Sequence, residues 1–351
     1  MGVCGPEFVT NRVRDRAPQG PGLCDPGLLT PADEATPEQM EYWEQYFIKN
    51  VIQYPGRHLL EIGKPESGKT QFLYYCIDNF REYSPDEAIL YFDIGKGDEI
   101  LSILYYCAYL RHEPATIVTL PGCEIDIHGP PGLDLDFVTV ARTADVWDHI
   151  IPGQITIASF DPFVEEPLVA VEQSALMYHA LSRRAHRRQI TAPATIIQDE
   201  FQNICPAPGY GYAGTGREAM LQTRSINLIR QNAQKLRAMQ LRLLVTIHDW
   251  TQLHPGVRSA FEWMVLRRGS RITSSTDRLS DFNGLWRKIQ TPYGYLVLPD
   301  GTFSSKLKFP HYKEGNKLGY ITYEGVYEPP KPSKKKKSKK KNEDEEEEDE
   351  E

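Results

Sequence analysis

The chain has 351 residues, of which 40% are hydrophobic and 25% charged, and a formal net charge of −8. This length can bury one large α/β core or two smaller ones, and the acidic balance argues against a surface that coats nucleic acid through broad positive charge. The six cysteines are scattered without a C-x-x-C pair, which favours reduced thiols in a cytoplasmic setting over disulfides or a zinc site. No apolar run approaches the length of a membrane span.

The chain begins with about 35 residues that are rich in proline, glycine and charge, so we expect an irregular arm over residues 1–35. A helix is predicted to start after Thr36, which can cap it. Pro37 suits the first helical position, and Gln39 completes a capping-box pattern. This helix opens the main predicted domain, residues 36–290.

Residues 63–70 read G-K-P-E-S-G-K-T and match G-x-x-x-x-G-K-[ST], the phosphate-binding loop. The apolar run at 58–62 predicts a short buried strand before the loop, and 71–77 predict a helix after it. In that order these segments make an anion site, because backbone N–H groups of the loop and first helical turn point at phosphate oxygens. We therefore expect ATP to be bound here, by Gly63, Lys64, Pro65, Glu66, Ser67, Gly68, Lys69, Thr70 and Gln71.

Apolar strands and helical patterns then alternate along the chain. Further strands are predicted at 88–93, 155–161, 194–200 and 241–248, and helices at 100–110, 169–187 and 217–239. Residues 114–140 are mixed and are compatible with either short strands or an inserted lobe. The alternation predicts an α/β P-loop NTPase (RecA-like) fold, with a mostly parallel sheet and helices on both faces.

Polar residues follow several of these strands, where ligands of parallel sheets bind. Asp199 and Glu200 end one strand. Asp199 is predicted to hold Mg²⁺ together with the Thr70 hydroxyl, and Glu200 to act as the general base for water. Lys69 is predicted to contact the outer phosphates. His248 ends the next strand and either senses the terminal phosphate or only caps that strand.

Hydrolysis also needs a cation for the charge that develops on the phosphate. Arg217 and Arg224 are the leading candidates among several arginines downstream of the acidic pair, although each taken alone is more typical of a surface residue. The glycine-rich segment 206–217 carries two tyrosines. It is compatible with a mobile element that touches nucleic acid or with a simple flexible connection.

The character of the chain changes after Pro292. Residues 291–330 predict a small β-rich extension, and 331–351 form a tail of lysines followed by acidic residues. Such a tail cannot bury apolar surface and is expected to be disordered. It is compatible with an interaction tail or with a solubilising extension.

Four motifs resemble those of the HerA–FtsK superfamily of ring-forming ATPases. They are the loop at 63–70, D-I-G-K-G-D-E at 93–99 (similar to the family's D-P-K-G-E), I-I-Q-D-E at 196–200, and the strand at 243–248. The resemblance spans residues 57–272. The chain departs from the family at Glu66, where glycine is frequent, at Ile94, where proline is favoured, and at His248, where glutamine is usual.

The resemblance implies a homo-oligomer, a hexamer with ATP sites between subunits, that translocates double-stranded DNA through a central pore. It favours a viral genome-packaging motor with DNA-stimulated ATPase activity, located in the host cytoplasm or the virion, with capsid or portal proteins as further partners. Two alternatives stay open at this stage. One is a nucleotide-dependent assembly switch or scaffold, and the other is a phosphotransferase that uses the same loop.

Overall fold

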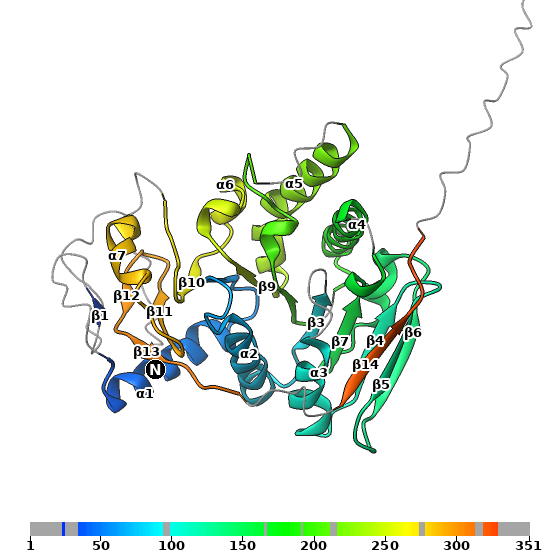
Figure 1. Cartoon of the computed structure of the whole chain (residues 1–351), viewed down its shortest axis with the longest axis horizontal. Coiled ribbons are helices and arrows are strands. Elements are labelled where there is room, and N and C mark those ends of the chain that lie inside the picture. The colour runs from blue at the N-terminus through cyan, green and yellow to red at the C-terminus, as the bar shows by residue number, and fades with distance from the viewer. Residues whose placement is uncertain are drawn as a thin grey trace, which may run out of the picture.

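The computed structural model describes residues 23–24, 34–93, 99–164, 167–190, 192–210, 216–273, 278–312 and 319–328. Most of its strands belong to one sheet with the order β1-β12-β11-β10-β2-β9-β8-β3-β7-β4-β6, and β13 pairs with β11 (Figure 1). The predicted arm and tail lie outside the described residues, apart from the short strand β1 (Leu23–Cys24) and residues 34–35.

The centre of the sheet is parallel. From one side to the other it consists of β10 (Trp263–Leu266), β2 (Leu59–Ile62), β9 (Leu241–Ile247), β8 (Ala194–Gln198), β3 (Ala88–Asp93), β7 (Ile155–Ser159), β4 (Ala115–Thr119) and β6 (Leu135–Thr139). Parallel pairing continues without a break from β10 to β6. The carboxyl ends of these strands therefore lie along one edge of the sheet.

Helices cover both faces of the sheet. They are α1 (Pro37–Phe47), α2 (Lys69–Tyr83), α3 (Glu99–Leu104), α4 (Pro167–His186), α5 (Arg217–Ala238), α6 (Pro255–Arg258) and α7 (Asn283–Trp286). Connections from β2 through α2 to β3, and onward through α3 to β4, move in one direction along the sheet. Those through α4, α5 and α6 move back. Because such crossovers are right-handed, the two groups take opposite faces, as their separation in Figure 1 indicates. The predicted P-loop NTPase fold is confirmed.

Local sequence signals explain several element boundaries. The capping box that starts α1 is present: Thr36 Oγ1 accepts from the Gln39 backbone N–H at 3.3 Å, and Gln39 Oε1 accepts from the Thr36 N–H at 2.9 Å. The predicted helix at 100–110 divides into α3 and a π-helical turn, Tyr105–Tyr109. Among the described residues, no helix is both long and apolar enough to cross a membrane.

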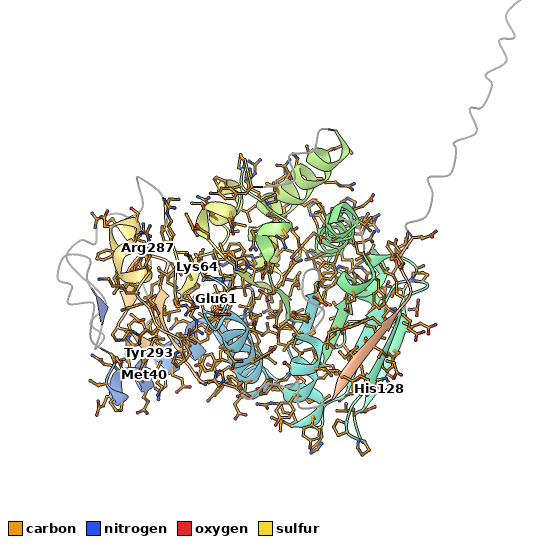
Figure 2. All side chains as sticks on the ribbon, in the orientation of Figure 1. Met40, Glu61, Lys64, His128, Arg287 and Tyr293 are labelled. Atoms are coloured by element: carbon orange, nitrogen blue, oxygen red, sulfur yellow. The ribbon has the colours of Figure 1, made fainter. Side chains whose placement is uncertain are left out.

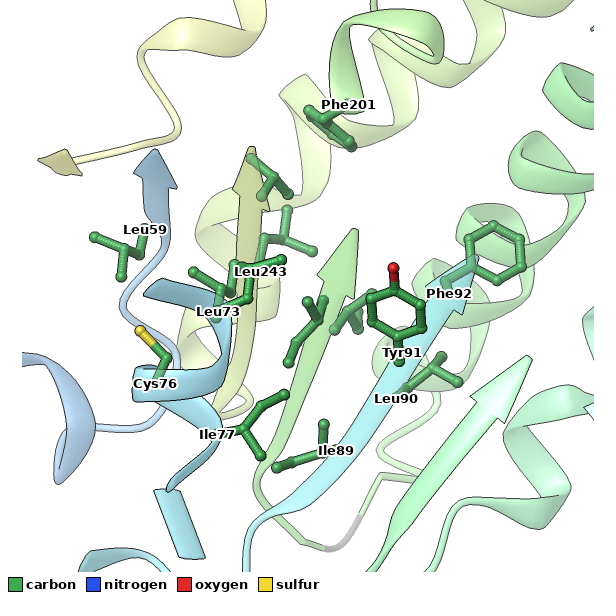
Figure 3. Close-up of a cluster of buried hydrophobic side chains, with 14 of the residues drawn as sticks. Leu59, Leu73, Cys76, Ile77, Ile89, Leu90, Tyr91, Phe92, Phe201 and Leu243 are labelled. Atoms are coloured by element: carbon green, nitrogen blue, oxygen red, sulfur yellow. The ribbon is translucent and has the colours of Figure 1, made fainter. Parts of the chain in front are cut away.

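The apolar core lies between α2 and the central strands. Leu73, Cys76 and Ile77 of α2 lie against the sheet that carries Leu59 and Leu243 (Figure 3). All five side chains are buried, with exposed fractions of 2% or less. The strands read as continuous apolar runs because both of their faces are covered. This packing holds the start of α2, and with it the phosphate loop, at a fixed position on the sheet edge.

The region 114–140 contains short strands rather than an independent lobe. β4 and β6 extend the main sheet, and β5 (Glu124–His128) between them pairs antiparallel with β14 (Tyr320–Glu324). The C-terminal strands β11 (Tyr293–Val297), β12 (Phe303–Ser304) and β13 (Leu307–Lys308) continue the same sheet beyond β10. The C-terminal segment thus reaches both ends of the molecule, with Tyr293 at one and the His128 strand at the other (Figure 2).

Candidate active site

The phosphate loop is fastened to the strands on either side of β2. The Gly63 N–H donates to the Ile247 carbonyl of β9 at 3.1 Å, and the Lys64 N–H donates to the Arg268 carbonyl just after β10 at 3.0 Å. Lys64 lies beyond the end of β2, past the buried Glu61 (Figure 2). Because these contacts come from neighbouring parallel strands, the sheet itself sets the direction in which the loop leaves β2.

The glycines of the loop are required by its geometry. A Cβ atom on Gly63 would lie 2.4 Å from Ser67 Oγ and 2.7 Å from Arg267 Cβ. Gly68 has a φ of 90° and precedes the first residue of α2. A left-handed backbone at that point costs glycine little and other residues more. The turn therefore closes tightly and leaves the first N–H groups of the 15-residue helix α2 available to an anion.

Glu66 is the unusual residue of the loop. Its φ is 60°, a left-handed conformation that side chains other than those of glycine, asparagine and aspartate seldom adopt. Its carboxylate is 89% exposed and lies 3.7 Å from the Arg268 guanidinium, which also approaches the Pro65 carbonyl at 3.4 Å. The loop thus adopts the bend that glycine would permit, at the cost of local strain.

The amine of Lys69 lies beneath this loop and joins it to the neighbouring strand. The side chain is 5% exposed. Nζ donates to the Gly63 carbonyl at 2.8 Å, approaches the Lys64 carbonyl at 3.4 Å, and lies 3.1 Å from Nδ1 of His248. An ammonium group can only donate, so Nδ1 of His248 accepts.

His248 extends this chain of contacts to the acidic pair. Its Nε2 lies 2.9 Å from Oε2 of Glu200. With Nδ1 accepting from Lys69, Nε2 carries the ring proton and donates it to the carboxylate. Gln202 Nε2 also donates to this carboxylate at 3.0 Å. The arrangement depends on sheet order, because β9 lies between β2 and β8, and the residue that follows β9, His248, lies between Lys69 and Glu200.

The backbone at Glu200 is held in a strained conformation. Its φ is 54°, and it precedes a short 3₁₀ turn, Phe201–Asn203. The Glu200 N–H donates to Asp199 Oδ1 at 3.0 Å and to Thr246 Oγ1 at 3.3 Å. The Thr246 hydroxyl of β9 also donates to Asp199 Oδ1. Asp199 is 6% exposed. These contacts fix both carboxylates at the sheet edge that carries the phosphate loop.

The next residues of α2 face other partners. The Thr70 hydroxyl lies 3.4 Å from Oε1 of Glu99. Gln71, predicted to help bind nucleotide, uses its side-chain oxygen to accept the Tyr312 N–H at 2.6 Å. Glu99 was not among the predicted site residues. Its place at the end of the second-strand motif was the available signal, but the pattern did not reveal which helix its side chain would contact.

The two predicted arginines both belong to α5. Arg217 begins α5, and its side chain lies outside the described part of the structure. Arg224 is exposed on α5, and its charge, after burial, helps lower the pKa of His179 on α4. Among the described side chains, the contacts given above join the phosphate loop to Asp199, Glu200 and His248, and Arg224 takes no part in them.

The cluster fits a nucleotide with its metal. The hydroxyl of Ser67 is 1% exposed and has no hydrogen-bond partner among the described residues. A buried orphan of this kind is costly unless a ligand or water satisfies it. Nζ of Lys69 donates to a loop carbonyl and lies beside the His248 imidazole, at the N-terminus of α2, where an anion is favoured. The site would accept phosphate oxygens, and Thr70 and Asp199 offer the hard oxygen ligands that Mg²⁺ takes.

Comparisons with known proteins add a likeness of fold. No protein-family model matches the sequence, and no curated protein sequence matches it. Among solved structures, the genome packaging NTPase B204 of Sulfolobus turreted icosahedral virus 2 in complex with ATP-gammaS is similar over 72% of this chain and 98% of its own, with 8% identity and a TM-score of 0.41.

Two other structures show a similar degree of likeness. The pCW3 conjugation coupling protein TcpA with ATPgS matches 77% of this chain and 65% of its own, at 11% identity and a TM-score of 0.39. EssC ATPases 2 and 3 from Geobacillus thermodenitrificans match 74% and 41%, at 9% identity and 0.35. At such scores these likenesses carry no inference about activity. By its own strand order and phosphate loop, the chain has the fold of a P-loop NTPase.

Proposed function

We propose that the chain hydrolyses ATP at the carboxyl edge of its sheet. The observation that supports this most is the chain of contacts from Lys69 through His248 to Glu200, with separations of 3.1 and 2.9 Å. It connects a phosphate-loop lysine with a carboxylate on a different strand. Catalysis of phosphoryl transfer consists mainly of positioning and charge stabilisation, and this edge of the sheet supplies the groups for both.

Each residue has a distinct role in the proposal. The loop N–H groups and Lys69 bind the β- and γ-phosphates. Thr70 and Asp199 hold Mg²⁺, which when bound neutralises charge on the phosphate oxygens. Glu200 accepts a proton from the attacking water and orients it. Its carboxylate contacts His248 and Gln202, whereas that of Asp199 accepts from Thr246, so the two acids have separate partners and serve different functions.

His248 links phosphate binding to the base. As the contacts stand, Lys69 and Glu200 are joined through its ring. When a γ-phosphate takes the Lys69 ammonium, Nδ1 of His248 loses its donor. The imidazole can then rotate towards the phosphate, and this rotation draws Nε2 away from Glu200. The base is thereby released for water only when a triphosphate is present.

We further propose that six copies of this chain form a ring, a homo-hexamer, and that ATP hydrolysis moves double-stranded DNA through it. The DNA is a viral genome. It is packaged with capsid or portal proteins as partners, in the host cytoplasm or the virion. The sequence motifs support this. So does the basic character of the helices beyond the site: α4 and α5 pack together and carry the exposed side chains of Arg183 and Arg224, and the exposed Arg187 follows the end of α4. Arg217 and Arg224 are proposed to complete a neighbouring subunit's site.

The test is ATP hydrolysis with and without duplex DNA, read together with mass in solution. The proposal expects DNA to raise the rate, assembly into a ring, and loss of turnover in Lys69→Ala. A stable monomer whose ATP turnover does not change with DNA would contradict the proposed motor function. Slow DNA-independent turnover with nucleotide-dependent assembly would instead support an assembly switch.

Mixing variants tests whether the site is shared between subunits. Arg224→Ala alone is expected to lower turnover by at least about 10³-fold if it acts as an arginine finger. An equal mixture of Arg224→Ala and Lys69→Ala chains should regain activity, because some interfaces then combine an intact loop with an intact arginine. Arg230→Ala, also exposed on α5, is the matched control. No recovery in the mixture would count against Arg224.

A further inference from the structure

A carboxylate outside the predicted site touches the first turn of α2. Glu99 opens α3, and its two oxygens have different partners: Oε1 lies 3.4 Å from the Thr70 hydroxyl, and Oε2 accepts a hydrogen bond from the Tyr74 hydroxyl. Thr70 and Tyr74 are four residues apart and so lie on one face of α2. The carboxylate therefore spans one helical turn and reaches the residue proposed to bind the metal.

Tyr74 anchors this carboxylate. Its side chain is 2% exposed, and its ring lies 5.0 Å from that of Tyr106 and 6.5 Å from that of Tyr312, measured between centroids. Burial, reinforced by the neighbouring Glu99, raises the pKa of Tyr74. The phenol therefore keeps its proton and remains a donor to Glu99. The packing of the Tyr74 ring thus fixes the position of the Glu99 carboxylate.

A threonine hydroxyl can coordinate a metal through an oxygen lone pair only when its hydrogen points elsewhere. An acceptor on the far side of the hydroxyl sets that orientation and makes the oxygen a better ligand, as outer partners do for other metal ligands. We propose that Glu99 is a positioning residue of the Mg²⁺ site. It accepts the Thr70 hydroxyl hydrogen and adds negative charge beside the cation, an inference that rests on the proposed role of Thr70 in ATP binding.

The other side of the site is built on the same principle. Asp199 on β8 receives the Thr246 hydroxyl of β9, which fixes one of its oxygens. Glu99 would then approach the metal from α3, which follows β3 in the chain, and Asp199 from the end of β8, which pairs with β3. Two carboxylates, each held by a hydroxyl donor, would set the direction of the metal relative to the phosphates.

The test measures the Mg²⁺ dependence of nucleotide binding, with a fluorescent non-hydrolysable ATP analogue as the probe. Glu99→Gln keeps the shape of the side chain but removes the charge. We expect it to raise the Mg²⁺ concentration for half-maximal binding by about 10- to 100-fold, while binding of the analogue in EDTA stays unchanged. Tyr74→Phe keeps the carboxylate and loses its anchor, so a smaller shift in the same direction is expected.

The chain offers a matched control on the same helix. Tyr75 donates to Glu44 of α1 at 3.5 Å, so Glu44→Gln removes the charge from a similar tyrosine–carboxylate contact away from the loop. Its Mg²⁺ midpoint should stay at the wild-type value. A wild-type midpoint in Glu99→Gln beside a shifted one in Thr70→Ala would overturn the role of Glu99 and leave the proposed function intact. An unshifted midpoint in Thr70→Ala would overturn both. Tyr74→Phe decides the question if Glu99→Gln does not fold.

Discussion

Glu61 and Glu200 stand on strands of the same sheet, and each faces a basic side chain, yet their surroundings differ. Glu61 lies inside β2 with no exposed surface, and its Oε1 lies 2.8 Å from Nε of Arg267, which is 1% exposed. Glu200 lies just past β8 and keeps 14% of its side chain exposed beside His248. One carboxylate is enclosed by the fold, and the other opens onto the sheet edge.

The basic partners of the two glutamates differ in how firmly the fold holds them. Arg267 is packed over the Phe309 ring, 4.2 Å from its centroid, and donates to the Pro292 carbonyl at 3.0 Å, so it cannot leave Glu61 without disturbing the C-terminal strands. His248 holds Glu200 through a single ring that also binds Lys69. A buried pair of the first kind supports structure, whereas one of the second kind can be rearranged by a ligand. Position relative to the strand end decides which role a glutamate takes.

The largest expected effect comes from breaking the enclosed pair. Arg267→Ala removes the donor to the buried Glu61 carboxyl and the packing over Phe309, and should lower the free energy of unfolding by about 3–5 kcal/mol, measured by urea denaturation. The double variant Glu61→Leu/Arg267→Met replaces the whole pair with apolar side chains of similar size, and should recover most of that loss. An Arg267→Ala protein with wild-type stability would show that the pair does not support the sheet.

The pH dependence of stability tests Glu61 itself. Burial raises the pKa of Glu61 to about 8, against the opposing effect of Arg267. Because the pKa in the folded state lies above that of the unfolded chain, the contribution is complete below about pH 4.5 and is lost as pH rises through about 8, with a slope of at most about 1.4 kcal/mol per pH unit. Glu61→Gln should flatten this slope. An identical pH profile in the variant would show that Glu61 is ionised throughout.

The smallest effect is expected in the loop. Glu66→Gly relieves the left-handed strain and removes a carboxylate close to the phosphates, and Glu66→Ala removes only the carboxylate. Both should raise ATP affinity by less than about fivefold, because the group is exposed. Only the glycine variant should also raise the melting temperature, by the equivalent of about 1 kcal/mol. Equal melting temperatures for the two variants would show that the backbone of Glu66 is not strained.

Much of this arrangement could be predicted from the sequence because its signals are local. The capping box at Thr36, the loop at 63–70 and the apolar runs before Asp93 and Asp199 each depend on neighbouring residues, and the structure confirms the corresponding elements. Parallel strands then bring their ends together regardless of loop length. The convergence of Lys69, Asp199, Glu200 and His248 followed from that rule.

The missed features depend on contacts between distant segments. The pairing of β14 with β5 joins residues nearly 200 positions apart, and no local pattern specifies it. The Glu61–Arg267 pair was hidden because an acid inside an apolar strand has no visible partner in the sequence. Glu99 was likewise assigned to its own motif rather than to Thr70. In each case the sequence showed the type of side chain but not which distant residue it contacts.

The most direct test compares Glu200→Gln with Glu61→Gln in parallel assays of ATP binding, phosphate release and thermal melting. If Glu200 is the general base, Glu200→Gln should bind ATP and melt like the wild type, yet release phosphate about 10²- to 10⁴-fold more slowly. Glu61→Gln should retain turnover and change only the pH dependence of its stability. Wild-type phosphate release by Glu200→Gln would contradict the hydrolytic site described for this sheet edge.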